Sequence, residues 1–329
     1  MESKYGLLII AILFSFMLSS CTSTQSPEAK GDVPSSSRIG GSGSVEISFV
    51  DGFPPNNIYI DPSQPSSNEF EFIVNIQNRG SFPKTDEGSL NGKLYLTGYD
   101  PSLIKGGDWQ GAGDAGNQFN RLRGVSDSTP QGETIQKSFE ADEIVYPFET
   151  REYPLSLMLN ACYYYETDAT ATVCIDPDPA MQKDKVCTQG SPMIDPHNAP
   201  VVVAGITQTG TSEKSIFTID LSARSNGRIL KAFQPRDISR ELCTNPDYDD
   251  FDKIGVRTEI TGLGEGNCRP SGSAEEPIRI YNGRATIVCE FPVPNDQQNA
   301  YTTQMKIKLQ YGITESMTKS VTLINTAVS

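Results

Sequence analysis

Apolar residues recur at every second position along most of this chain, and that period decides which folds are open to it. Val45, Ile47 and Phe49 alternate with Glu46 and Ser48. Similar alternation or a short apolar run occurs at residues 70–76, 90–96, 155–159, 201–206, 216–221, 255–260, 278–281, 285–291, 304–311 and 319–324. Successive side chains of a strand point to opposite faces, so the pattern predicts half-buried strands. Because no long segment has the 3.6-residue period of a helix, the sequence predicts an all-β, antiparallel sandwich or barrel.

The two halves of the chain are similar to each other. The pattern of Phe72–Gly80 returns at Phe217–Arg224, and residues 157–175 and 307–324 each predict a strand, a polar turn and a second strand. Such an echo is typical of two copies of one unit, so we predict two tandem β-sandwiches. The expected segments are a signal peptide at 1–20, a disordered tether at 21–44, a first sandwich at 45–177, a connector at 178–199 and a second sandwich at 200–329.

The N-terminus has the pattern of an exported protein. Gly6–Met17 is almost continuously apolar and follows Lys4, but it is shorter than the ~20 residues that cross a bilayer. The run Leu18-Ser19-Ser20-Cys21 matches a lipobox, which predicts cleavage before Cys21 and lipidation of its thiol. An uncleaved membrane anchor and an ordinary secretory signal are the alternatives. Each alternative leaves the rest of the chain outside the cytoplasm, and the lipobox predicts attachment to the membrane surface through lipid.

The remaining cysteines are even in number, which indicates disulfides in an oxidising compartment. They are Cys162, Cys174, Cys187, Cys243, Cys268 and Cys289. No Cys-x-x-Cys pair occurs, so a zinc site is disfavoured. Cys268–Cys289 is the preferred bond because the two flank a predicted strand pair. Cys162–Cys174 across a hairpin and Cys174–Cys187 are alternatives in the first half. With three cysteines in each half, either a bond such as Cys187–Cys243 joins the halves or two thiols stay free.

The charge of the chain restricts its partners. A formal net charge of −14 argues against binding nucleic acid or anionic lipid through a basic surface. Asp247, Asp249, Asp250 and Asp252 form an oxygen-rich cluster of the kind that holds Ca²⁺. The cluster lacks the glycine and terminal glutamate of an EF-hand, and a solvated acidic loop is the favoured alternative. Calcium is the one cofactor that the sequence suggests.

A long stretch without a predicted strand, Lys105–Gln136, is the candidate binding loop. It contains the only tryptophan, Trp109, together with Phe119, Arg121 and Arg123. Aromatic residues and arginine are enriched at recognition surfaces, and structureless loops of this length are often functional. The alternative is an insertion whose aromatic side chains pack on the edge of the sandwich.

Motifs for catalysis or nucleotide binding are weak. Gly111-x-Gly113-x-x-Gly116 matches the dinucleotide-binding pattern by letter, but no apolar helical face follows it. His197 is the only histidine, it lies in a proline-rich connector, and no Gly-x-Ser-x-Gly or His-Glu-x-x-His motif occurs. We therefore predict no catalytic activity. A glycoside hydrolase needs only two carboxylates and stays as a minor alternative.

Short motifs give the chain a resemblance to known surface modules. The strand that ends in Asn78-Arg79-Gly80 and the segment Leu94–Pro101 resemble immunoglobulin-like, cell-adhesion-related (CARDB-like) modules of bacterial and archaeal surface proteins. Tyr99-Asp100-Pro101 and Cys174-Ile175-Asp176-Pro177 resemble predicted surface proteins of small-genome archaea. The resemblance implies immunoglobulin-like sandwiches on an exterior surface and no catalytic residues.

The function that follows is a lipid-anchored surface protein for binding or architecture, such as adhesion. Its expected partners are the membrane, through the lipid on Cys21, and a surface protein or glycan whose identity the sequence leaves open. A lipoprotein that captures a solute or glycan is the alternative, and it predicts a concave pocket lined with aromatic residues.

Overall fold

The computed structural model describes residues 38–39, 44–83, 90–105, 117–181, 185–225, 227–232, 237–273, 276–295 and 297–327. Residues 36–329 form one compact unit. The predicted signal peptide, Cys21 and most of the predicted tether lie outside the described residues.

The first half of the chain contributes a four-stranded antiparallel sheet. Its order is β1 (Arg38–Ile39), β2 (Val45–Phe49), β4 (Phe70–Asn78) and β8 (Thr134–Ala141). Every second residue of β4 is buried, as the alternation predicts, and the Phe72 ring on β4 stacks on Phe139 of β8. The sheet therefore has one face toward the core and one toward solvent.

The second half contributes a sheet of the same kind. Its order is β11 (Val201–Gly210), β12 (Lys214–Ala223), β18 (Arg284–Pro292) and β16 (Asn267–Arg269). The middle strand β12 contains the sequence that is similar to β4, and both strands pair with a preceding strand on one side and a later strand on the other. The order of pairing thus repeats in the two halves.

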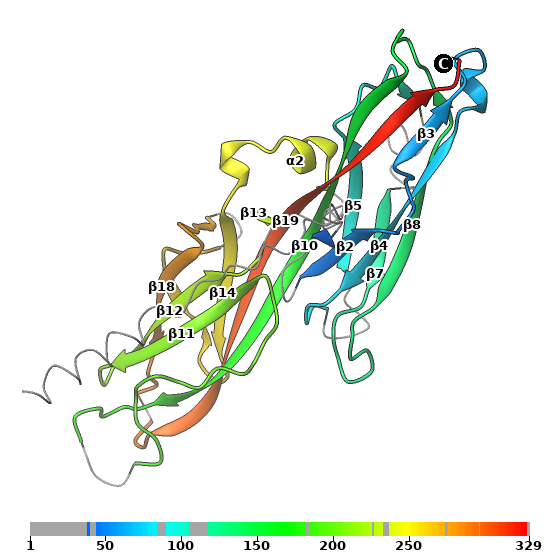
Figure 1. Ribbon diagram of the computed structural model, residues 1–329. Helices are drawn as coiled ribbons and strands as arrows, with labels where there is room; N and C mark the ends of the chain where they lie inside the picture. The colour runs from blue at the N-terminus through cyan, green and yellow to red at the C-terminus, as the bar shows by residue number, and fades with distance from the viewer. Residues whose placement is uncertain are drawn as a thin grey trace, which may run out of the picture. The chain divides into compact units, whose positions relative to one another are not determined.

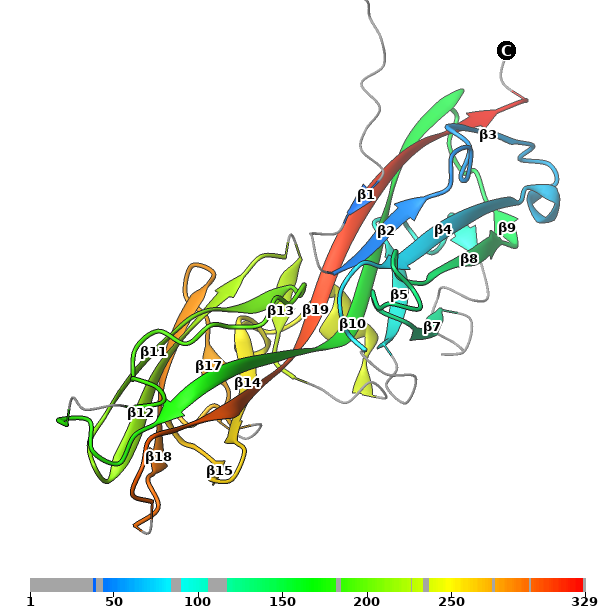
Figure 2. The same cartoon turned by 90° about the horizontal axis from the view of Figure 1, so that it is seen from below.

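A nine-stranded sheet runs through both halves. Its main path is β15 (Gly264–Glu265), β14 (Lys253–Ile260), β19 (Tyr301–Asn325), β10 (Glu152–Ile175), β5 (Leu90–Thr97) and β7 (Gln118–Leu122). Three short strands complete it, namely β13 (Arg228–Leu230), β3 (Asn57–Ile60) and β17 (Ile278–Arg279). β3 pairs with β19 in parallel, and the other pairs are antiparallel. Figures 1 and 2 show β10 and β19 running side by side along their whole length.

The two long strands correct a sequence-based expectation. Residues 157–175 and 307–324 were each expected to turn back at a polar segment, but both lie within single strands of 24 and 25 residues. Most polar residues do not interrupt these strands because they occupy outward positions. Thr167 and Glu315 are buried inward exceptions. The Thr167 hydroxyl is bonded to the Val201 carbonyl at 2.8 Å and to the Tyr311 hydroxyl at 2.7 Å.

One hydrophobic core includes residues from both four-stranded sheets and from the nine-stranded sheet. Odd-numbered residues of β10 and β19, among them Tyr163, Tyr165 and Tyr311, point into it. The ring centroids of Tyr165 and Tyr311 lie 5.9 Å apart, and the Tyr311 hydroxyl accepts a hydrogen bond from the Val201 amide at 3.1 Å. The core thereby links β10 and β19 to the first strand of the second half.

The remaining elements are short. β6 (Ile104–Lys105) pairs with β9 (Glu143–Ile144), and the helical pieces are η1 (Pro65–Ser67), α2 (Arg240–Thr244) and η3 (Tyr248–Asp250). No helix within the described residues has the length and apolar content needed to cross a bilayer. The fold is all-β with several antiparallel sheets, as the sequence predicts. The division into two tandem immunoglobulin-like sandwiches at 178–199 stays a prediction.

Candidate functional site

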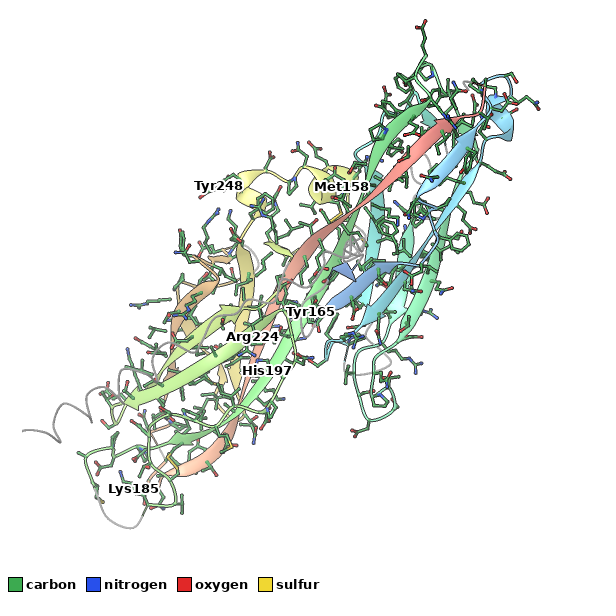
Figure 3. All side chains as sticks on the ribbon, in the orientation of Figure 1. Met158, Tyr165, Lys185, His197, Arg224 and Tyr248 are labelled. Carbon is green, nitrogen blue, oxygen red and sulfur yellow. A yellow bond between two sulfur atoms is a disulfide. The ribbon has the colours of Figure 1, made fainter. Side chains whose placement is uncertain are left out.

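Six cysteines of the described chain form three disulfides. Cys268–Cys289 joins directly opposite residues of β16 and β18, as preferred from the sequence. Cys174–Cys187, one of the alternatives, joins the end of β10 to the segment that follows it. Lys185, labelled in Figure 3, holds the same segment through an ion pair of 2.6 Å with Asp176.

The third disulfide, Cys162–Cys243, joins the two halves of the chain. The alternative hairpin pair Cys162–Cys174 does not form, because both cysteines lie on the single strand β10. Cys162 instead points outward and holds α2 against the sheet. Around this bond the Tyr95 hydroxyl donates to the Ile238 carbonyl at 3.3 Å, and the Thr314 hydroxyl donates to the Cys243 carbonyl at 3.0 Å.

The acidic residues after α2 are used within the protein. Asp250 accepts a hydrogen bond from the Asp247 amide at 3.0 Å and pairs with Lys231 at 2.5 Å. Although burial alone would raise the pKa of Asp250, the bond from Lys231 and the Asp247 amide hold it below its usual range. Asp249 lies 3.3 Å from Lys253, and Asp252 has a left-handed backbone with φ of 57°. Across the described part of the chain, no three His, Cys, Asp or Glu residues are arranged to hold a metal ion.

The residues of the candidate binding loop have separate positions. Phe119 is fully buried on β7, and its ring lies over Gly92, where a side chain would collide with it. Arg121 and Arg123 are exposed, and Arg121 has φ of 59°. Trp109 lies outside the described residues. Phe119 is therefore part of the core, while the two arginines remain accessible.

His197 supports the edge of β11. Its Nε2 accepts a hydrogen bond from the Val203 amide at 3.0 Å, while its Nδ1 lies 3.0 Å from the Asp195 carbonyl oxygen. The arrangement fits the tautomer whose Nδ1–H donates to Asp195. Both ring nitrogens thus bind backbone groups, which holds the segment around His197, labelled in Figure 3, against β11.

The outward face of β10 and β19 carries a polar network. The Tyr164 hydroxyl donates to Glu166 at 2.6 Å, and Gln310 donates to the same carboxylate at 2.9 Å. Lys308 binds the other oxygen of Glu166 at 2.9 Å. Partial burial opposes ionisation of Glu166, but the bonds from Tyr164, Gln310 and Lys308 hold its pKa below the usual range. Glu166 is therefore an ionised carboxylate, which suits it to accept hydrogen bonds and not to donate a proton.

A hollow of about 360 Å³ lies beside this network on β10, β19 and β14. Asp168, Lys308 and Arg257 lie opposite one another on the three neighbouring strands. Lys308 is 3.9 Å from Asp168, and Arg257 donates to Glu265 at 2.6 Å. The hollow is lined by paired charges, and no aromatic residue of the described chain lines it.

A second hollow, of about 490 Å³, lies over the turn between β17 and β18. Its lining includes Tyr281, Arg279 and Arg284. Tyr281 is 69% exposed, so its ring is available to a ligand. Tyr281 is the one aromatic residue of the described chain that lines this hollow, whereas the capture alternative predicts a pocket lined with several.

Glu315 is a buried carboxylic acid in the core that no sequence motif marks. Tyr163 donates to its Oε1 at 3.0 Å and Ser225 at 3.4 Å, while Oε2 has no hydrogen-bond partner among the described residues. Burial raises its pKa to about 7 despite these two donors. The sequence does contain a signal of this burial, because Glu315 lies between the inward-facing Ile313 and Met317 in the two-residue alternation.

Comparisons with protein-family models and with curated proteins found no significant match. Function must therefore be argued from the chain's own residues.

Proposed function

We propose that this chain is an exported, lipid-anchored surface protein whose β-sheet body serves binding or envelope architecture without catalysis. The observation that carries the proposal is the pairing of six cysteines in three disulfides, with Cys21 as the seventh cysteine in the lipobox. Stable disulfides are typical of proteins outside the cytoplasm. The kinship with cell-adhesion-related modules is proposed on the sequence motifs alone.

An architectural role is supported by the continuity of the nine-stranded sheet. β10 and β19 pair over 24 positions, and Cys162–Cys243 ties the two halves together at the middle of this ladder. Pulling the halves apart would require many backbone hydrogen bonds to break together. A rigid body of this kind suits a protein that bears load or holds a binding face away from the membrane.

A non-catalytic role is supported by the state of the carboxyl groups. Glu166 faces solvent but is held ionised, whereas a glycosidase acid needs a raised pKa. Glu315 has a raised pKa, but it is only 3% exposed and lies in the core. Neither carboxyl group combines access to substrate with the protonation that such chemistry needs.

Metabolic labelling with a radioactive fatty acid tests the anchor. We expect label on the wild-type protein and none on Cys21→Ser. The matched control is Cys187→Ser, which removes a different cysteine and should keep the label. Label that persists on Cys21→Ser, or that is lost only from Cys187→Ser, would contradict the lipid-anchor proposal.

Glycan or solute capture is a second candidate function, favoured by the exposed Tyr281 ring and the two arginines that line the 490 Å³ hollow. Open hollows of this size are common ligand sites. A glycan-array screen of the full-length protein tests it. Capture predicts binding that is lost on Tyr281→Ala, and an array without any bound glycan would exclude glycans as the captured ligand.

A further inference from the structure

The rim of the 490 Å³ hollow is built on a tight hairpin turn. The Tyr281 amide donates to the Arg284 carbonyl at 2.8 Å, and the Arg284 amide donates back to Tyr281 at 3.0 Å. Asn282 and Gly283 between them have φ of 50° and 74°, the left-handed conformations of a type I′ turn. In such a pair the two flanking side chains lie next to each other on one face of the hairpin. Tyr281 and Arg284 therefore form a joined aromatic and cationic surface.

A second arginine extends this surface. Arg279 precedes Tyr281 by two residues, and the intervening Ile280 is buried, so both side chains point away from the core. The Arg279 guanidinium carbon lies 4.6 Å from the centre of the Tyr248 ring, within cation–π distance. Tyr248 is 77% exposed on the segment after α2, where Figure 3 labels it. Two exposed tyrosines and two arginines thus come together from separate parts of the chain.

The charge of the hollow is opposite to that of the molecule. The chain has 41 acidic and 27 basic residues, yet the charged residues lining the hollow, Arg279 and Arg284, are both basic. Two carboxylates contact residues that line the hollow, and one of them, Asp249, shares Arg279, which leaves Arg284 as the arginine for an anionic ligand. Asp249 lies 3.3 Å from Lys253 and 3.5 Å from Arg279, and Asp220 accepts a hydrogen bond from Thr286 at 2.6 Å. An anionic ligand is complementary to this surface.

We propose that this hollow binds a carboxylated glycan, with a uronic acid residue stacked on Tyr281 and its carboxylate on Arg284. The proposal rests on the second candidate function and names its ligand class. The C–H face of a pyranose ring packs on an aromatic ring, and the fork of an arginine binds a carboxylate through two parallel hydrogen bonds. A uronic acid carries both features within one sugar residue, which matches neighbouring side chains on one hairpin. The open rim is suited to a chain that passes across it.

The test uses the full-length protein in mild detergent and isothermal titration calorimetry. The ligand is tetragalacturonic acid, with maltotetraose as the neutral sugar and hexaglutamate as the acidic peptide. We expect tetragalacturonic acid to bind, with an affinity that falls as salt is added, and the other two to bind at least about tenfold more weakly. Tyr281→Ala and Arg284→Gln should each weaken binding about tenfold.

Tyr59→Ala is the matched control, because Tyr59 is a 66% exposed tyrosine on β3. It should leave the affinity unchanged, and circular dichroism should show that all variants keep the β-sheet signal. Equal binding of maltotetraose would overturn the acidic specificity while keeping glycan capture. Tighter binding of hexaglutamate, unchanged affinity in Arg284→Gln, or no tetragalacturonic acid binding at about 10 mM would overturn the proposal. None of these outcomes alters the lipid-anchor test.

Discussion

Glu315 is the residue whose burial most strongly couples the fold to pH. Its pKa is about 7 in the folded protein against an ordinary 4.5, so folding favours the protonated form. The contribution of Glu315 to folded stability is then fully present at low pH, falls as pH rises from 4.5 through 7, and stays lower above that. The loss is about 3 kcal/mol for this group. Tyr163, its hydrogen-bond donor, does not titrate in this window because burial raises its pKa further above 10.

We expect Glu315→Gln to remove this loss. The free energy of unfolding should rise by about 3 kcal/mol at pH 8 and by less than about 1 kcal/mol at pH 5. Chemical denaturation at the two pH values measures the difference. An equal effect of the substitution at both pH values would show that Glu315 does not ionise across this range.

Burial of single residues was predictable where the two-residue period holds. The period predicts one or two buried rings in the run 163–165, and the structure buries Tyr163 and Tyr165 while Tyr164 lies on the outer face. It does not identify Phe119 as a core residue, because the surrounding glycine-rich sequence lacks alternation. That assignment depends on Gly92, which leaves room for the ring on the neighbouring strand. The fit of the Phe119 ring over Gly92 joins residues far apart in the sequence, so it cannot be predicted from the local sequence pattern.

At the scale of elements, the existence of most strands was predictable and their ends were not. The polar turn expected around Asp168 does not form, because residues 167–172 continue β10. The segment lacks glycine, proline and asparagine, so nothing in its backbone chemistry requires a turn. Ala169 and Ala171 are small apolar residues that keep the inward alternation. Because alanine is only weakly hydrophobic, the two-residue period is hard to recognise in this part of the sequence.

Substitutions at Ala169 and Thr172 distinguish a strand from a turn in this part of β10. Ala169 is buried, so Ala169→Asp should lower the free energy of unfolding by about 3 kcal/mol or more through an unpaired buried charge. Thr172→Asp, on the exposed face of the same strand, should change it by less than about 0.5 kcal/mol. Urea denaturation gives both values. A tolerated Ala169→Asp would mean that this residue does not face the core.

The element α2 depends on its disulfide more than on its helix. It has only five residues, and Cys162–Cys243 closes a loop of 81 residues. Replacing both cysteines by alanine should lower the free energy of unfolding by about 4 kcal/mol, because the unfolded chain gains freedom. The matched pair Cys174→Ala/Cys187→Ala, with a separation of 13 residues, should lower it by about 3 kcal/mol. The reverse order in guanidinium titrations would contradict this explanation.

At the scale of the whole molecule, the nine-stranded sheet was not predictable. The sequence indicates two similar halves, but the partner of each final strand depends on residues far along the chain. Glu152 pairs with Ile324 and Ile175 with Tyr301, so the last strands of the two halves share one ladder. The alternation of apolar and polar residues indicates which face of a strand is buried. It does not indicate which strand lies beside it.

The shared ladder predicts how the molecule responds to a cut. Val186 and Met193 are exposed in the segment between β10 and β11, so limited proteolysis should cleave there early. The two fragments should still elute together in gel filtration, even after reduction of Cys162–Cys243, because β10 and β19 remain paired. Reducing denaturing electrophoresis should separate them. Fragments that part under native reducing conditions would show that the ladder does not hold the halves together.

The pairing of β10 with β19 also sets the order in which the molecule is assembled. Synthesis delivers β10 long before β19, so an edge of β10 keeps unsatisfied backbone groups until β19 has been made. Contacts between such distant segments give a high contact order and slow folding. The central sheet is therefore completed only after β19 has been made, which would suit transport of the unfolded chain under the proposed export. In that case β19 would close the sheet outside the cytoplasm, where the cysteines form their disulfides.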